Sequence, residues 1–541
     1  MDQWYKNAIF YGIEVKSFYD GNGDGIGDFA GIIQKLDYLA SLGITCIWLL
    51  PFYPSGGRDN GYDIIDYYSI DPSYGTFTEF KKCIKEAKKR NIRIIIDLVV
   101  NHTSDLHPWF QKAREHPKSK YRDYFVWTKE IPEKNHEEDS PAFPNVEAGV
   151  WKFDAVAKEF YFHRFYHFQP DLNIANKKVQ EEIFTIAEFW LKFGIAGFRI
   201  DATRLLFARK GKDGTEVSNA KEFLNSLHTF IKKINPEAIM LGETDIESKE
   251  IDFYFGNGKR IHLLYNFLLN RYIFLSFARQ NANFMSKELQ SLPTPPLNAQ
   301  WVNFLRNVDE LNIDRLTQRE KGDIFSAFAP AAYMQIYNRG IRRRLAPMFD
   351  GDLRRLKMAY SVIFSLPGAV LFVYGEEIGM GEDMSLPERE SVRIPMQWDS
   401  SKNAGFSLVN PKGLLRSVLS EGPFRYQSVN VLDQEKDEAS LLNHIRHLTE
   451  IKKVHQEIGH GMYQLISVKP KNVFAIAYAF EGEVTIAVHN LSPKPAQVEL
   501  TAFKNTELKE FFSDGEYFKN EKATAIPLNG YGYRWFTVKR K

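Results

Sequence analysis

The 541-residue sequence predicts an α/β fold: a (β/α)8 TIM barrel with an inserted subdomain after the third strand and a C-terminal antiparallel β-sandwich domain. Three observations support this prediction. Short β-branched runs alternate with helical patterns through the first three quarters of the chain. One long segment interrupts this alternation, and the last part of the chain changes to closely spaced alternating strands.

The predicted barrel strands are near-continuous apolar runs, as expected for parallel strands that are covered on both faces. The segments between them, such as 30–42 and 76–90, carry apolar residues at helical spacing. Strand and helix alternating over roughly eight units favour a closed barrel over an open sheet. The predicted strands are 8–15, 44–50, 92–100, 195–200, 238–242, 301–305 and 369–374.

The interruption spans residues 102–171, which are rich in Pro, Lys, Glu and aromatic residues and show little periodicity. Such a segment is too long for a simple loop, so we expect an inserted subdomain. Residues 1–101 and 172–458 would then form the barrel, and 459–541 a separate β domain. Its predicted strands are 463–468, 473–479, 483–489, 497–501 and a closing strand at 530–538.

Composition narrows the classes of partner. Lys and Arg total 70 against 68 Asp and Glu, and this near balance argues against a nucleic-acid or membrane-surface partner. No apolar run is long enough to span a membrane, and the N-terminus lacks a secretory pattern. Cys46 and Cys83 lie in apolar or helical patterns, so we expect buried free thiols and a cytoplasmic protein. Oligomeric state stays open, with a homo-oligomer among the alternatives.

Charged residues mark four of the predicted strand ends, and barrel active sites lie at the carboxyl ends of the strands. A single Asp at such an end usually caps the next helix. Four charged strand ends in one barrel indicate a site instead. The residues are Asp97 and His102, Arg199 and Asp201, Glu243, and Asp309.

Two carboxyl groups at neighbouring strand ends suit the cleavage of a glycosidic bond with retention. That reaction needs a carboxylate nucleophile and a protonatable carboxyl group about 5–5.5 Å away. Arg199 lies two residues before Asp201, on the same side of the strand, where it favours the ionised carboxylate. Glu243 needs a raised pKa to act first as an acid and then as a base.

These segments, in this order, resemble the motifs of the α-amylase family of glycoside hydrolases, family 13. The resemblance runs from about Trp4 to the end of the chain and is closer still to the trehalose synthases, the maltose α-D-glucosyltransferases of that family. Stretches similar to theirs lie at 49–55, 339–348, 375–381 and 392–398.

The resemblance implies a role for each site residue. Asp201 would be the nucleophile, Glu243 the general acid/base and Asp309 a carboxylate that binds sugar hydroxyls. The implied reaction is an intramolecular transglucosylation that interconverts maltose and trehalose through a covalent glucosyl-enzyme, with some hydrolysis to glucose and no organic cofactor. The residues that would complete the glucose pocket are Asp59, Tyr62, His102, Arg199 and Arg393.

Two positions depart from the family pattern. Val308 stands where most members carry a His that donates a hydrogen bond to the sugar. Loss of one such donor is expected to lower turnover by about one to three orders of magnitude. Asn266 stands where the resembling enzymes commonly have another His, which suggests a pocket rebuilt for a different acceptor.

A calcium loop is predicted near the N-terminus. Residues 20–28 space oxygen donors at alternate positions, as Ca²⁺ loops do, although a Gly/Asp turn without metal has the same composition. The resemblance implies a structural Ca²⁺ and a second site at Asn101 and Asp171 that Ala208 leaves incomplete. The implied ligands of the first site are Asp20, Asn22, Asp24, the carbonyl of Ile26, and Asp28.

Other functions stay open at this point. The chain could be an α-glucosidase or transglucosidase acting on maltose, sucrose or short α-glucans, or a sugar-binding homologue with impaired catalysis. The intact Asp201, Glu243 and Asp309 argue against the last of these. The Arg-rich run 339–344 is either a solvated helix face or, as in the resembling enzymes, part of what closes the pocket and excludes water.

Overall fold

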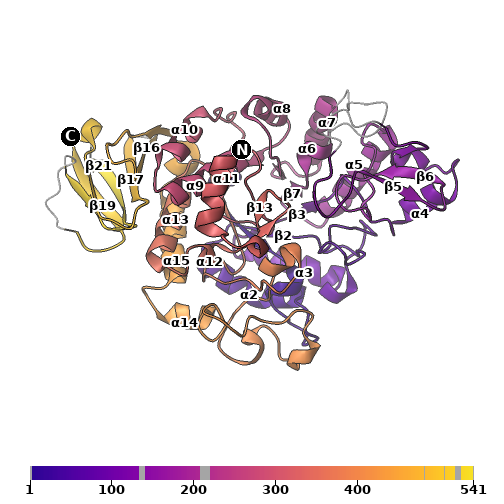
Figure 1. The fold of residues 1–541 in the computed structure, drawn as a ribbon, viewed down its shortest axis with the longest axis horizontal. Coiled ribbons are helices and arrows are strands. Elements are labelled where there is room, and N and C mark those ends of the chain that lie inside the picture. Colours follow the sequence, from indigo (N-terminus) through magenta and orange to yellow (C-terminus); the bar gives the residue numbers. More distant parts are fainter. Residues whose placement is uncertain are drawn as a thin grey trace.

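Eight parallel strands close into a barrel in the computed structural model, which confirms the predicted fold class. The structure describes residues 3–132, 140–206, 220–480, 482–504, 506–517 and 525–539. Figure 1 shows the barrel in the middle of the molecule, between the inserted segment and the C-terminal sheets. Its strands are β1 (Ile9–Ile13), β2 (Cys46–Leu49), β3 (Arg93–Leu98), β7 (Gly197–Ile200), β8 (Ile239–Gly242), β9 (Leu263–Tyr265), β10 (Gln300–Phe304) and β14 (Ala369–Val373).

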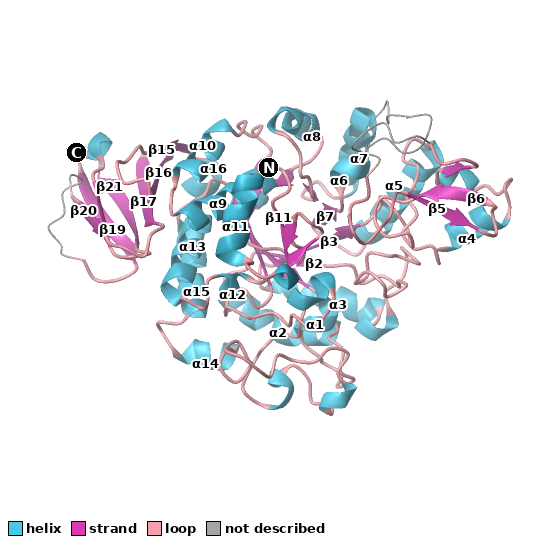
Figure 2. Cartoon of the chain, viewed as in Figure 1, coloured by secondary structure: helices cyan, strands magenta, loops and turns pink. Residues whose placement is uncertain are grey.

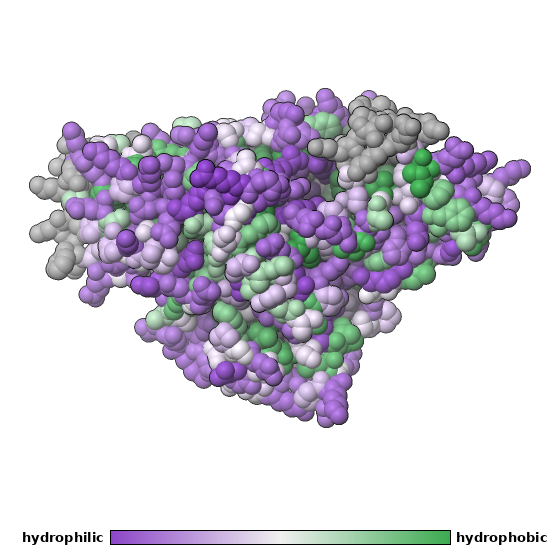
Figure 3. All heavy atoms as spheres, viewed as in Figure 1, coloured by the Kyte–Doolittle hydropathy of each residue, from purple (hydrophilic) through white to green (hydrophobic). Residues whose placement is uncertain are grey.

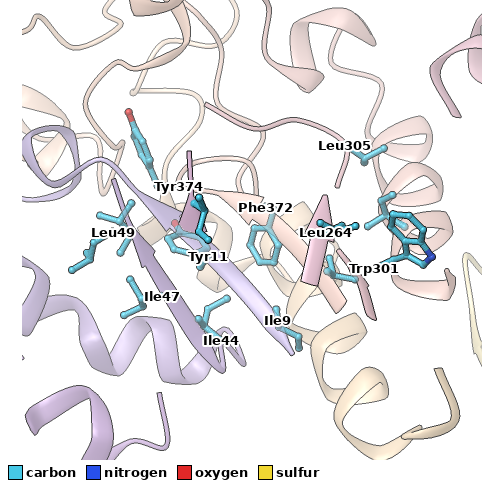
Figure 4. Packing of buried hydrophobic residues seen from close by; sticks show 14 of the residues in the cluster. Ile9, Tyr11, Ile44, Ile47, Leu49, Leu264, Trp301, Leu305, Phe372 and Tyr374 are labelled. Atoms are coloured by element: carbon cyan, nitrogen blue, oxygen red, sulfur yellow. The ribbon is translucent and has the colours of Figure 1, made fainter. Parts of the chain in front are cut away.

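Alternate side chains of each strand belong to two different cores. Phe10, Trp48 and Leu241 point into the barrel and pack with one another. Their neighbours Tyr11 and Leu49, two of the side chains drawn in Figure 4, pack outward against residues of the surrounding helices. Because both faces are covered, most of the strand residues are apolar, and the buried charged residues Asp97 and Arg199 are exceptions. The exception to the prediction is β9, which at three residues is too short to stand out as a run.

Helices pack around these strands (Figure 2). The predicted helix at 76–90 begins with a reciprocal capping box, in which Thr76 accepts from the backbone of Glu79 and the Glu79 carboxylate accepts from Thr76. The longer helices are α2 (Phe29–Ser41), α3 (Phe77–Lys89), α4 (Pro108–Glu115), α5 (Lys177–Leu191), α7 (Ala220–Ile234), α9 (Phe267–Arg279), α10 (Asn283–Ser291), α11 (Gln318–Phe328), α13 (Leu353–Ser365) and α15 (Leu441–Val454). The shorter ones are α1 (Val15–Phe18), α6 (Thr203–Leu206), α8 (Ile251–Phe255), α12 (Leu345–Met348), α14 (Val431–Lys436) and α16 (Glu457–His460).

The segment predicted as an inserted subdomain holds a small antiparallel sheet. Strands β4 (Trp127–Thr128), β6 (Glu159–Phe162) and β5 (Trp151–Asp154) pair in that order. An isolated antiparallel bridge joins His102 to Asp171, so the two ends of the segment meet beside the barrel. A second small sheet, formed by β11 (Leu311–Asn312), β13 (Gly340–Ile341) and β12 (Gln335–Ile336), follows β10 along the chain.

The C-terminal part consists of two antiparallel sheets packed face to face. The five-stranded sheet has the order β15 (Met462–Leu465), β16 (Val473–Phe480), β17 (Glu483–Asn490), β21 (Tyr533–Lys539), β19 (Glu507–Ser513). Ile486 and Phe536 pack on the smaller sheet of β18 (Ala496–Val498) and β20 (Ile526–Leu528), whereas the indole of Trp535 donates to Ser361 Oγ of α13 at 2.9 Å. The sequence did not predict β19 and β20.

The surface in Figure 3 is largely hydrophilic, with scattered apolar side chains. Along the described part of the chain, no helix combines the length and the apolar character needed to cross a membrane.

Burial lowers the pKa of three of the buried histidines to about 3. His107 caps α4, whereas His444 in α15 and His489 in β17 both hydrogen-bond to residues of α13. Since an unfolded histidine titrates near its ordinary pKa of 6.5, the unfolded chain binds more protons than the folded one below that pH.

We therefore predict that stability is insensitive to these histidines above about pH 6.5 and falls as the pH drops toward 3, by about 1.4 kcal/mol per pH unit for each of them. Thermal unfolding of the unaltered protein between pH 5 and 8 measures this dependence. His444→Asn should flatten the slope, whereas replacement of the exposed His116 by Asn should not. Equal slopes in all three proteins would contradict the prediction.

Candidate active site

The predicted site residues come together at the carboxyl edge of the barrel. Asp97 on β3 lies directly opposite Arg199 on β7 in the parallel register. Ile200 is likewise opposite Gly242, so Asp201 and Glu243, the next residues of β7 and β8, leave the barrel side by side. Parallel pairing alone therefore places three carboxyl groups around one arginine.

The guanidinium of Arg199 binds all three of these carboxyl groups. Its Nη1 lies 2.7 Å from Asp97 Oδ1 and 2.5 Å from Asp201 Oδ1, and its Nη2 lies 2.8 Å from Glu243 Oε1. The arginine side chain is 1% exposed. The indole of Trp48 donates to the other oxygen of Asp97 at 2.8 Å. Adjacent nitrogens of one planar group thus fix the separation of Asp201 and Glu243.

Glu243 meets the requirement for a group that can give and take a proton near neutrality. Burial, with smaller contributions from Asp201 and Asp309, raises the pKa of Glu243 to about 7 against the opposing effect of Arg199. The Glu243 carboxylate also accepts from the backbone N–H of Ala202 at 3.1 Å. Ala202 has a left-handed φ of 43°, a strained conformation for a residue with a Cβ and one that often occurs at active sites.

Asp309 faces the opposite electrostatic environment. Burial alone would raise the pKa of Asp309, but Arg389 and Arg393 outweigh it and hold that pKa below its ordinary value. The Oδ1 atom of Asp309 lies 2.9 Å from Arg393 Nη2 and 3.0 Å from Arg389 Nη1. Arg306 donates to the backbone carbonyl of Asp309 at 2.8 Å. Asp309 is therefore a fixed carboxylate suited to accept hydrogen bonds from a sugar.

The remaining predicted pocket residues line the same site. Burial raises the pKa of Asp59 to about 7, and Gln169 donates to its carboxyl group at 2.8 Å. The ring of His102 lies 3.2 Å from the carbonyl of Tyr62, measured from Nε2. Among the described residues, nothing hydrogen-bonds the buried hydroxyl of Tyr62, so that hydroxyl is available to a ligand.

Sequence reasoning missed Arg389 and Gln169. Arg389 lies on the 3-10 turn Glu388–Val392, four residues before Arg393, and bridges Asp309 to Glu310. The spacing of the two arginines was the available signal. Gln169 is fully buried in the inserted segment and binds Asp59, which lies 110 residues away in the sequence. No local sequence pattern indicates a contact over that separation.

The two departures from the family pattern have different consequences. Val308 is 2% exposed and packs into the apolar core of the barrel with Phe304 and Tyr265, while its carbonyl accepts from Arg393. The rebuilding of the pocket for a different acceptor stays a prediction, and Asn266 itself has a structural role. Its side chain caps α9 by accepting from Leu269 and donates to Asn303, so it serves the barrel rather than a ligand.

The Arg-rich run 339–344 is not a solvated helix face. It follows β12 and forms β13 and an extended segment rather than a helix. Arg339 pairs with Glu310 at 3.0 Å, Arg343 pairs with Glu382 at 2.8 Å, and Arg344 is buried. The run therefore belongs to the wall of the site.

An aromatic cluster joins this wall to the inserted segment. The cluster combines Phe143, Tyr166 and Phe168 with Ile336 and Tyr337. Both of its tyrosine hydroxyls hydrogen-bond the carboxylate of Glu388, and the Arg389 guanidinium lies 4.9 Å from the Phe143 ring. Arg389 therefore connects this cluster to Asp309.

The predicted calcium loop is a tightly hydrogen-bonded turn. The carboxylate of Asp20 accepts from Gly23 and Gly25, and Asp28 caps α2 by accepting from Gly31. Over the described ranges, no three His, Cys, Asp or Glu side chains converge as metal ligands. The oxygen-only donor set still fits the chemistry of Ca²⁺, so the metal stays a prediction. Ala208, the reason for expecting an incomplete second site, lies outside the described residues.

Comparison with known proteins agrees with the geometry. The model of the α-amylase catalytic domain matches residues 13–461, and that of a sucrose hydrolase-like C-terminal domain matches residues 482–537. The chain belongs to the α-amylase family.

Relatives and solved structures match along almost the whole chain. A trehalose synthase/amylase of Mycobacterium tuberculosis is 37% identical over 99% of this chain and 90% of its own length. A trehalose synthase of Thermus thermophilus is 38% identical over 99% of this chain and 56% of its own length. The structure of a trehalose-6-phosphate hydrolase from Bacillus licheniformis superimposes with a TM-score of 0.81 at 25% identity, covering 99% of this chain and 100% of that one.

The position of Val308 leads to a prediction. Val308→His should raise kcat/KM for an α-glucoside by about 10- to 1000-fold, because the restored donor strengthens in the transition state. The melting temperature should fall, since the imidazole enters an apolar core. Steady-state kinetics measure the effect beside Val308→Leu, which keeps the site apolar. Equal kcat/KM in the two variants would refute it.

Proposed function

We propose that the protein is a retaining isomerase that interconverts maltose and trehalose by intramolecular transglucosylation. The observation that carries this proposal is the Arg199 cluster, in which one guanidinium holds Asp201 beside Glu243, a carboxyl group with a pKa of about 7. This is the arrangement that a double displacement requires. Two relatives that match 99% of this chain, named a trehalose synthase/amylase and a trehalose synthase, support the choice of substrate.

In the first step, the carboxylate of Asp201 attacks the anomeric carbon of the non-reducing glucose. The glycosidic C–O bond breaks as Glu243 transfers its proton to the departing oxygen, leaving a glucosyl ester on Asp201 and free glucose. In the second step, the anomeric hydroxyl of the rotated glucose attacks the anomeric carbon of the bound glucosyl unit and gives its proton to Glu243, while the bond from that carbon to the Asp201 carboxylate breaks. Every bond formed is matched by one broken, so no nucleotide or organic cofactor is consumed.

The other residues hold the glucosyl unit in place. Asp309, fixed by Arg393 and Arg389, is the acceptor for sugar hydroxyls, and the hydroxyl of Tyr62 is an available donor. Asp59 and His102 complete the pocket for the transferred glucose. Binding energy at sugar hydroxyls remote from the reacting bond orients that bond and so lowers the barrier. Substitution of these residues should therefore reduce kcat as well as affinity.

The aromatic cluster supports transfer to glucose over transfer to water. Its rings join the inserted segment to the wall at Tyr337 and cover one side of the pocket. A covered pocket retains the freed glucose while the covalent intermediate exists. The alternative function is an α-glucosidase, in which water replaces glucose in the second step. The likeness to a solved trehalose-6-phosphate hydrolase favours keeping it as the second candidate.

A structural Ca²⁺ and a cytoplasmic location complete the proposal. Asp20, Asn22, Asp24, the carbonyl of Ile26, and Asp28 would hold the ion, which would pin the first loop and supply no chemistry to the reaction. The buried free thiols of Cys46 and Cys83 suit a reducing compartment.

Product analysis tests the function. Purified protein incubated with maltose should yield trehalose as the main product and glucose as a minor one, followed by chromatography. Asp201→Ala should abolish both products, since no nucleophile remains. Glucose as the main product would establish the hydrolase instead. Conversion that persists in Asp201→Ala would disprove the assigned mechanism.

Calcium removal tests the metal. Chelation should lower the melting temperature by a few degrees, because a ligand that binds only the folded state stabilises it by mass action. Added Ca²⁺ should restore the melting temperature, and Asp24→Ala should show neither effect. A melting temperature that changes with neither chelator nor Ca²⁺ would show that the loop is a metal-free turn.

A further inference from the structure

Arg416 makes contacts that neither the motifs nor the proposed mechanism account for. It lies between the 3-10 turn Pro411–Gly413 and α14, in a part of the chain with little regular structure. Its side chain is only 10% exposed. Its Nη1 atom lies 3.0 Å from Glu14 Oε2 and donates to the backbone carbonyl of Arg393 at 2.7 Å. Nη2 donates to the side-chain oxygen of Asn60.

Glu14 anchors this arginine to the barrel. It is the first residue after β1, its side chain is 4% exposed, and it accepts from Ser17 Oγ at 2.7 Å. Burial would raise the pKa of Glu14, but Arg416 and Lys16 outweigh it and lower that pKa to about 2. The carboxylate is therefore charged at any physiological pH, and the ion pair does not respond to pH in that range.

Arg416 also lies 3.8 Å from the carboxylate of Glu390, and its two hydrogen bonds outside the Glu14 pair each end at or next to a predicted glucose-binding residue. Asn60 directly follows Asp59, has a left-handed φ of 50°, and also accepts from Lys16 Nζ at 2.9 Å. The other contact is to the backbone carbonyl of Arg393, which accepts from Arg416 and also lies 3.1 Å from Ser17 Oγ. From there Arg393 reaches Asp309.

We propose that the Glu14–Arg416 ion pair positions the glucose pocket, by fixing the turn that carries Asp59 and the segment that carries Arg393 to the end of β1. This inference rests on the proposed function and deepens it. Neither member of the pair belongs to the predicted pocket, so both are positioning residues. Because a misplacement of about 1 Å costs up to about 100-fold in a site of this kind, loss of the pair should be felt as weakened glucose binding.

Glucose binding measured by calorimetry, with the melting temperature beside it, tests the proposal on the full chain. Arg416→Gln removes the guanidinium, and with it the ion pair to Glu14 and the hydrogen bonds to Asn60 and the Arg393 carbonyl, and should raise the Kd for glucose about 10- to 100-fold. Asn60→Gly keeps the left-handed turn without strain but deletes the oxygen that Arg416 and Lys16 bind. It should weaken binding by a smaller factor. The control is Arg534→Gln, which breaks the pair that a buried arginine forms with Glu510 in the C-terminal sheet, far from the glucose pocket in the sequence.

The outcomes separate positioning from simple structural support. Weaker glucose binding by Arg416→Gln and Asn60→Gly, with an unchanged Kd in Arg534→Gln, supports the proposal. If Arg416→Gln only lowers the melting temperature, as the control does, and binds glucose normally, the proposal is overturned. Should Arg416→Gln fail to fold, the Kd of Asn60→Gly decides alone.

The same experiment separates this inference from the proposed function. An unaltered protein that binds glucose but converts neither maltose nor trehalose contradicts the proposed function. In that case the Kd values of the variants still test the positioning role. An unaltered protein that binds no glucose overturns the positioning role as well.

Discussion

The pairing of Arg199 with three carboxyl groups is the interaction on which the rest of the site depends. A buried arginine without partners would cost several kcal/mol, and so would each buried carboxylate, so neither is tolerated alone. Together they form a compact cluster whose spacing is set by one rigid planar group. The barrel register supplies this cluster without any special loop, because Asp97, Arg199 and the residues after β7 and β8 are neighbours by strand pairing.

Asp309 lies outside the Arg199 cluster and faces two other arginines. Arg389 and Arg393 both bind one oxygen of Asp309, and the pKa of Asp309 lies below its ordinary value. Glu243 shares the single Arg199 with two other carboxyl groups, and burial leaves its pKa near 7. Carboxyl groups in one pocket thus acquire different tasks through the number of cations that each one faces.

The parts outside the barrel decide how the pocket is held and covered. The inserted segment contributes Gln169 and three members of the aromatic cluster. The stretch from Glu388 to Arg416 contributes three arginines and the carboxylate that accepts from two tyrosine hydroxyls. These contacts join segments hundreds of residues apart. In a reaction where glucose and water compete for one intermediate, such cover influences the product more than the carboxyl groups themselves do.

The sequence by itself determined the barrel and the identity of Asp201, Glu243 and Asp309, because buried parallel strands are apolar runs and the charges that end them stand out. It missed β9, β19 and β20. Only the tertiary structure assigned Asn266 to a helix cap, removed the 339–344 run from a helix face and revealed Gln169, Arg389 and Arg416. These roles arise from contacts between residues far apart in the sequence. The local pattern around a single Arg or Gln does not indicate which distant residue it binds.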